Sequence, residues 1–175
     1  TALVTNGLLM GKHIPLVVRS SWVRVSIDAG CAESYATIRR VDASQFEKVW
    51  ANVAALVEAK QAGNHDGLVI GIGFVVTKEN WREVGSCIRR AKEVGVDNVR
   101  ISAVFQPDDA AYFDDFYDTA SRECKQLAER YTTDSFKVFN LFGDRVSDLV
   151  EASPDYEFCG YQQFNTYIGG DLNVY

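Results

Sequence analysis

The stretch RVSIDAG, residues 24–30, places three polar side chains at every second position. Alternation of this kind is typical of a β-strand, in which successive side chains point to opposite faces. Arg24, Ser26 and Asp28 would share one face, and Val25 and Ile27 would occupy the other. A hydroxyl and a carboxylate can together bind a polar ligand by hydrogen bonds. The alternative is structural, with Asp28 capping the next segment and Ser26 bonding a neighbouring strand.

Two further segments repeat this alternation. In LVIGIGFVVT, residues 68–77, Gly71 and Gly73 alternate with large apolar residues, and in VRISAVFQ, residues 99–106, Arg100 and Ser102 do the same. The polar residues and glycines would therefore gather on one side of a sheet. Such a concentration indicates a ligand site, because a packed interior is normally filled by branched apolar residues.

The elements that must position these residues alternate along the chain. Strands are predicted over 2–7, 23–28, 68–77, 99–106 and 136–142, and helices over 44–63, 80–94 and 108–131. Ser44 with Glu47 has the spacing of a capping box, and Asn80 and Glu83 are predicted to cap the second helix. This order indicates right-handed βαβ units and a parallel sheet. Because the phosphate motifs GxGxxG and GxxxxGK[ST] are absent, a barrel is favoured over a nucleotide-binding open sheet.

Composition excludes several classes of function. The 175 residues are 47% hydrophobic and 24% charged, which suits one globular domain. A net charge of −6 without a dense Lys/Arg run argues against nucleic acid as a partner. The sequence contains no apolar stretch of the roughly 18 residues that would cross a bilayer, so no membrane partner is expected. The four cysteines have no CxxC spacing.

Several of these segments, taken in order, resemble radical S-adenosylmethionine enzymes with a C-terminal SPASM or twitch extension. The likeness is carried by TNG at 5–7, RVSIDAG at 24–30, GIGFVVTKEN at 71–80 and GVDNVRISAVFQP at 95–107. The tail CGYQQFNTYIGGDLNVY, 159–175, is similar to the start of such an extension. The resemblance implies an α/β fold with a partial (β/α)6 TIM-like barrel core at 1–145 and the beginning of an auxiliary iron-sulfur extension at 146–175.

The family's cofactor sites carry over to matching positions. The resemblance implies that S-adenosylmethionine lies across the strand ends and that an iron-sulfur cluster cleaves it reductively to a 5′-deoxyadenosyl radical, which abstracts hydrogen from substrate. Matching positions are Thr5 and Asn6 near the methionine part, Ser26 and Asp28 at its carboxylate or the ribose hydroxyls, and Gly71, Ile72, Gly73, Ser102 and Val104 beside adenine. Cys159 matches a ligand of an auxiliary 4Fe-4S cluster, which requires thiolates.

The sequence also departs from the family. The CxxxCxxC motif that holds the catalytic 4Fe-4S cluster is missing, as is the glycine-rich segment that follows it. We therefore expect the chain to be an internal fragment of a longer cytoplasmic enzyme and to be inactive alone. For the parent, the resemblance implies a peptide or small-molecule substrate and an electron donor such as flavodoxin or ferredoxin.

Two other interpretations stay open at this stage. The chain could belong to another TIM-barrel enzyme, a lyase or hydrolase that uses Asp28, His65 or Asp66 in acid-base chemistry. Alternatively, it could be a degenerate, non-catalytic barrel that acts as a binding module.

Overall fold

The computed structural model describes residues 1–106, 111–150 and 157. Within them, strands and helices alternate as predicted. The strands are β1 (Ala2–Thr5), β2 (Trp22–Ser26), β3 (Val69–Val76), β4 (Asn98–Ala103) and β5 (Lys137–Asn140). The helices are η1 (Met10–His13), α1 (Ile14–Val17), α2 (Ala32–Arg39), α3 (Ser44–Ala62), η2 (Trp81–Glu83), α4 (Val84–Val94), α5 (Tyr117–Tyr131) and α6 (Phe142–Val150).

The strands form one parallel sheet in the order β1-β2-β3-β4-β5. Spatial order follows chain order without a reversal, so the described sheet lacks the switch point that characterises doubly wound sheets. The predicted α/β class is confirmed. Closure into a (β/α)6 barrel stays a prediction.

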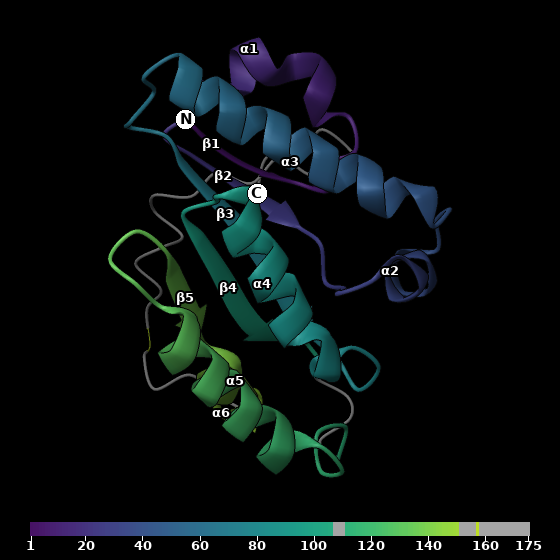
Figure 1. The fold of residues 1–175 in the computed structure, drawn as a ribbon. Coiled ribbons are helices and arrows are strands. Elements are labelled where there is room, and N and C mark those ends of the chain that lie inside the picture. The colour runs from purple at the N-terminus through teal and green to yellow at the C-terminus, as the bar shows by residue number, and fades with distance from the viewer. Residues whose placement is uncertain (107–110, 151–156, 158–175) are drawn as a thin grey trace.

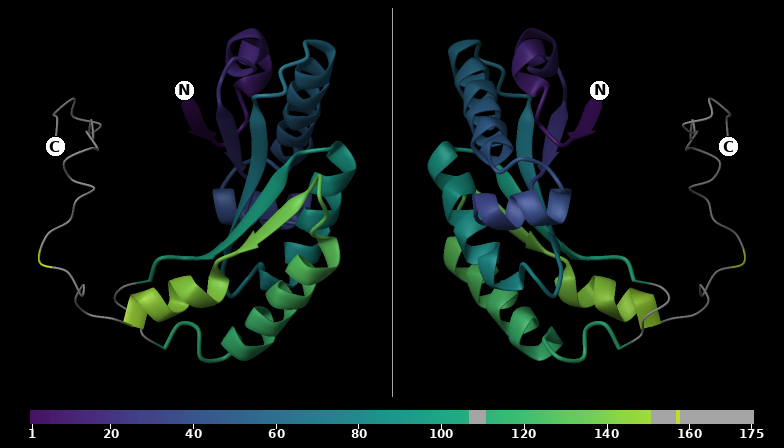
Figure 2. Two further views of the ribbon diagram at one scale, coloured as in Figure 1. Left: turned by 90° about the vertical axis from the view of Figure 1, so that its left-hand side faces the viewer. Right: turned by 90° about the vertical axis from the view of Figure 1, so that its right-hand side faces the viewer.

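Helices cover one face of this sheet. Helices α3, α4 and α5 lie side by side in front of the strands in Figure 1, and the side views show the sheet curving behind them. Neighbouring parallel strands joined through helices on one face are the product of crossovers of a single hand. Among the described residues, no helix lies across the other face in Figure 2, and α6 contacts β4 near the carboxyl end of that strand.

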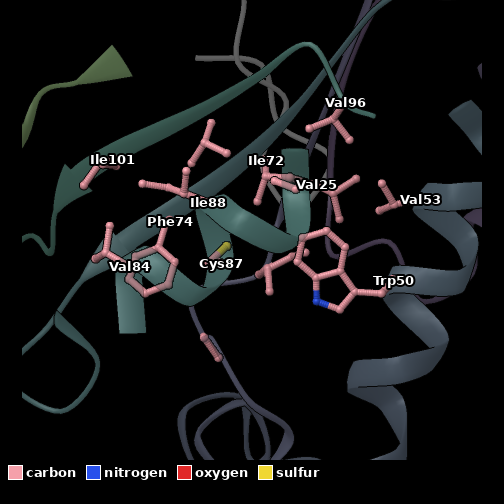
Figure 3. Close-up of a cluster of buried hydrophobic side chains, with 14 of the residues drawn as sticks. Val25, Trp50, Val53, Ile72, Phe74, Val84, Cys87, Ile88, Val96 and Ile101 are labelled. Carbon is pink, nitrogen blue, oxygen red and sulfur yellow. The ribbon is translucent and has the colours of Figure 1, made fainter. Parts of the chain in front are cut away.

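The core lies between the sheet and these helices (Figure 3). Val25, Ile72 and Ile101 from three adjacent strands are 0% exposed, and they meet Trp50 of α3 and Ile88 of α4. Burial of such side chains contributes about 1.5–3 kcal/mol each. The predicted alternation is therefore confirmed, since the intervening residues Arg24, Gly73 and Ser102 line the opposite face.

Helix α3 forms where its apolar spacing predicted it, with a different cap. The N-cap residue is Ala43, and Asp42, which precedes it, accepts the Ser44 backbone N–H through its Oδ1 at 2.9 Å. Glu47 does not complete a capping box and instead pairs with Arg90 of α4 at 2.5 Å. The capping-box prediction is wrong because a better-placed carboxylate precedes Ser44.

Other helical segments also differ from the prediction, and η1, α1 and α6 were not predicted. Helix α2 was not predicted, because Tyr35 is its one buried residue and no apolar stripe marks it. Helix α5 begins at Tyr117 and not at residue 108. Phe113 and Phe116 form a turn before it, with ring centroids 5.6 Å apart, so their apolar spacing reflects this cluster.

Two further predictions concern membrane-spanning helices and the carboxyl-terminal extension. Within the described residues, no helix combines the length and apolarity that a membrane crossing requires. Cys159 and most of the predicted extension at 146–175 lie outside the described residues, so the domain boundary stays a prediction.

Candidate functional site

A cleft of about 210 Å³ opens at the carboxyl ends of β2, β3 and β4, on the face that the helices leave open. Its polar and glycine lining comprises Arg24, Ser26, Asp28, Gly73, Arg100 and Ser102. In parallel α/β folds the carboxyl ends of the strands are where ligands bind. The volume of this cleft is below the range of about 300–1,000 Å³ that pockets for small ligands usually enclose.

Strand register explains why these residues meet. Ser26 of β2 pairs with Gly73 of β3, and Gly73 pairs in turn with Arg100 of β4. Partners in a parallel ladder point to the same face. Residues separated by about 75 positions in the chain are thus brought into one row across the sheet, as the alternation predicted.

Asp28 closes the end of β2 in a left-handed conformation, with φ of 58°. Its Oδ1 accepts the Val75 backbone N–H at 2.8 Å, and its Oδ2 accepts a hydrogen bond from Arg39 Nη2 at 2.6 Å. Arg39 Nη2 also donates to the Ser26 carbonyl at 3.0 Å. The carboxylate therefore fixes the ends of β2 and β3 to each other, and its side chain is 12% exposed.

Burial is the largest influence on this carboxyl group. It raises the pKa of Asp28, while the Arg39 guanidinium and the Val75 N–H act in the opposite direction. Because Asp28 and Arg39 form an ion pair, their charges offset each other at this end of the cleft.

Asn80 supports the same turn from behind and is 0% exposed. Its Nδ2 donates to the carbonyls of Asp28 and Val75, both at 2.9 Å, and its Oδ1 accepts the Thr77 N–H at 2.7 Å. The residue thus holds the β2 and β3 ends together. The prediction that its side chain caps a helix is wrong.

Glu83 anchors the loop that follows Asp28. Its carboxylate accepts the Gly30 backbone N–H at 2.7 Å and a short hydrogen bond from the Ser34 hydroxyl. A side chain at Gly30 would approach Glu83 within 2.8 Å. The predicted capping role of Glu83 is therefore replaced by a contact between η2 and the start of α2.

The two glycines of β3 differ in the space that is available for a side chain. A Cβ at residue 71 would lie 2.5 Å from Asn98 Oδ1. A Cβ at residue 73 would be at 3.4 Å or more from every neighbour, an ordinary contact, and would project into the cleft. The protein around Gly73 therefore does not require glycine, whereas a ligand approaching the backbone would.

The remaining predicted site residues do not line this cleft. Thr5 and Asn6 end β1 and use their side-chain oxygens locally, accepting the N–H groups of Gly7 and Leu8 at 3.1 Å. Ile72 is buried among the helices, and Val104 follows β4. Gly71 lines a separate hollow of about 240 Å³ nearer the amino ends of the strands. Cys159 lies outside the described residues.

Sequence reasoning missed four residues of the site or its support. Arg24 and Arg100 were predicted to lie on the same side as Ser26 and Ser102 but were not assigned to the cofactor. Arg39 gave no local signal, and Asn80 was predicted only as a helix cap, because each acts on a strand end that is distant in the sequence.

The alternative acid-base set is not assembled. Asp28 follows β2, at the carboxyl end of the sheet, whereas His65 and Asp66 lie in the loop before β3, at the amino end. Among the described residues no group of three His, Cys, Asp or Glu side chains could hold a metal ion. Cys87 and Cys124 are buried as free thiols in helices.

The chain matches no protein-family model and no curated protein sequence. Its fold is similar to part of SuiB from Streptococcus suis, with a TM-score of 0.58 and 12% identity over 80% of this chain and 32% of that chain. For SuiB bound to S-adenosylmethionine, the TM-score is 0.56 and the identity 13%, over 90% of this chain and 35% of that chain. For SuiB bound to its precursor peptide SuiA, the TM-score is 0.58 and the identity 12%, over 90% of this chain and 36% of that chain. The chain thus spans about a third of SuiB, and the similarity is one of fold.

Proposed function

We propose that this chain forms the S-adenosylmethionine-binding part of a radical S-adenosylmethionine enzyme, within a partial (β/α)6 barrel. The observation that carries the proposal is the cleft at the carboxyl ends of β2, β3 and β4. It unites Ser26, Asp28, Gly73 and Ser102, four residues that the sequence resemblance assigns to this cofactor.

Two independent lines support the cofactor. Three of the sequence segments that resemble the family, RVSIDAG, GIGFVVTKEN and GVDNVRISAVFQP, contribute residues to the cleft. The fold is also similar to that of SuiB, which has been solved with S-adenosylmethionine bound. The resemblance rests on residue types in order, whereas the fold comparison rests on backbone geometry at 13% identity.

The residues present fit the cofactor's polar groups and flat base. The hydroxyl residues Ser26 and Ser102 both line the cleft, and a hydroxyl can donate and accept hydrogen bonds with a ligand. Gly73 would allow a base to approach the β3 backbone. Both Asp28 oxygens already accept one hydrogen bond, but a carboxylate oxygen can accept a second.

The radical chemistry itself belongs to the proposal for the whole protein. In this family S-adenosylmethionine supplies a 5′-deoxyadenosyl radical once a 4Fe-4S cluster reduces it. The described residues do not fit such a cluster, since they contain no group of three metal-ligating side chains. A flavodoxin-like or ferredoxin-like donor, the auxiliary ligand Cys159 and a peptide substrate are proposed for the parent enzyme. The peptide is supported by the SuiB structure with SuiA.

Calorimetric titration of the chain with S-adenosylmethionine tests the binding role. Gly73→Val would fill the cleft and should weaken binding by roughly tenfold or more, since it removes the space for the ligand. Gly67→Val is the matched control, because a Cβ at residue 67 meets nothing within 4 Å and the residue lies before β3. Absence of binding at millimolar cofactor, or equal binding by both variants, would contradict the proposal.

A further inference from the structure

Two arginines of the open face have no carboxylate partner among the described residues. The four ion pairs among the described residues are Asp28–Arg39, Lys60–Asp97, Lys78–Asp115 and Arg90–Glu47. Arg24 and Arg100 take part in none of them, and the Nε of each is buried without a hydrogen-bond partner. Their charge is therefore available to something other than these described side chains.

The two side chains converge over Gly73. Arg100 is the register partner of Gly73 on β4, and Arg24 Cδ lies 3.4 Å from the position that a Cβ at residue 73 would occupy. Arg24 is also held from below, with its guanidinium carbon 5.3 Å from the centre of the Trp22 ring. Two guanidinium groups thus line one cleft whose floor lacks a side chain.

This arrangement is unfavourable for the protein alone. Burial and the neighbouring charge of Arg100 lower the pKa of Arg24, although a guanidinium stays protonated in proteins. Charged groups held together against mutual repulsion in a cleft are typical of a functional site. An anion between the two guanidinium groups would offset this repulsion.

The charge of the cofactor argues that this anion comes from the substrate. Asp28 and Arg39 already offset each other, so Arg24 and Arg100 leave the cleft with an excess of positive charge. S-adenosylmethionine carries a sulfonium and an ammonium group against one carboxylate, so it does not neutralise that excess. An acidic substrate would complement both the arginines and the cofactor.

We propose that Arg24 and Arg100 bind a carboxylate of the substrate, which makes the substrate an acidic peptide. Each guanidinium can form paired hydrogen bonds to a carboxylate, and the two would approach it from β2 and β4. This inference rests on the proposed function, because it places the carboxylate in the same cleft as the cofactor.

Binding of a short glutamate peptide with blocked ends to the 175-residue chain tests this assignment. Arg24→Gln and Arg100→Gln should each weaken binding roughly tenfold or more, because each removes a charge-assisted pair. Arg122→Gln, an exposed arginine on α5, is the matched control and should bind as the wild type does. The corresponding glutamine peptide should not bind. Unchanged affinity in Arg24→Gln and Arg100→Gln, or equal binding of the glutamine peptide, would overturn the proposal.

Two further measurements separate the substrate from the cofactor and from a structural role. The arginine variants could weaken binding of S-adenosylmethionine, but not of its decarboxylated analogue, and leave binding of the glutamate peptide unchanged. In that case Arg24 and Arg100 bind the cofactor, and the proposal is overturned. If the chain binds the peptide but not S-adenosylmethionine, the arginine site stands and the proposed function fails. Thermal midpoints of both variants should be no lower than that of the wild type, since repulsion is relieved. A lowered midpoint with unchanged peptide binding would make the arginines structural.

Discussion

The two faces of the same sheet are built for different purposes. On the helix-covered face, Val25, Ile72 and Ile101 are 0% exposed and pack against α3 and α4. On the open face, the alternating residues are arginine, serine and glycine around a cleft. Because adjacent residues of a strand point in opposite directions, one short segment can hold the fold together and present polar groups at once. The comparison teaches that stability and ligand binding can be altered separately here.

The largest expected difference between the two faces is the loss of stability when one aromatic residue on each is truncated. Phe74 is 1% exposed beneath α4, so Phe74→Ala should lower the free energy of unfolding by about 3–5 kcal/mol. Phe139 on the open face is 51% exposed, so Phe139→Ala should stay within about 0.5 kcal/mol. Urea unfolding followed by tryptophan fluorescence measures both. Similar losses in the two variants would mean that the open face is packed in solution.

Asn80 holds the ends of β2 and β3 together at the edge where the cleft lies. Asn80→Ala removes three hydrogen bonds and leaves the Asp28 and Val75 carbonyls and the Thr77 N–H without that partner. The expected loss is about 2–4 kcal/mol, because buried polar groups left unpaired are costly. Gln61→Ala serves as the control, since Gln61 is exposed on α3 and lies outside the predicted site.

The Asn80→Ala substitution should also weaken ligand binding. Asn80 holds the turn on which Asp28 lies, so the variant should bind S-adenosylmethionine more weakly than Gln61→Ala does. Calorimetry at a temperature where both variants are folded makes this comparison. Full stability of Asn80→Ala would show that its three hydrogen bonds are readily replaced by water.

The sequence predicted the sheet well and its support poorly, for a physical reason. Strand β3 and helix α3 were placed within one residue at each end, because a continuous apolar run and a regular apolar stripe are local signals. The same alternation placed Ser26, Gly73 and Ser102 on one face. Arg39 and Asn80 could not be found in this way, since they bond strand ends 11 and 52 positions away.

The two faces also differ in how they treat ionisable groups. Arginines on the open face keep their charge, whereas the apolar environment beneath α5 raises the pKa of the Cys124 thiol to about 12. In the unfolded chain a thiol titrates near 8.5. Between these values the unfolded chain loses the proton and the folded chain keeps it. The contribution of Cys124 to stability is therefore fully present below about pH 8.5 and is lost as the pH rises toward 12.

This difference can be measured as a slope. Between about pH 9 and pH 11, ionisation of the unfolded Cys124 thiol should lower the free energy of unfolding by up to about 1.4 kcal/mol per pH unit. Cys124→Ala should show a slope shallower by that amount. Ser121→Ala, on the same helix and without a titratable group, should retain the wild-type slope. Parallel curves for Cys124→Ala and the wild type would mean that water reaches the thiol in the folded chain, and that the helix-covered face is less closed than its 1% exposure at Cys124 indicates.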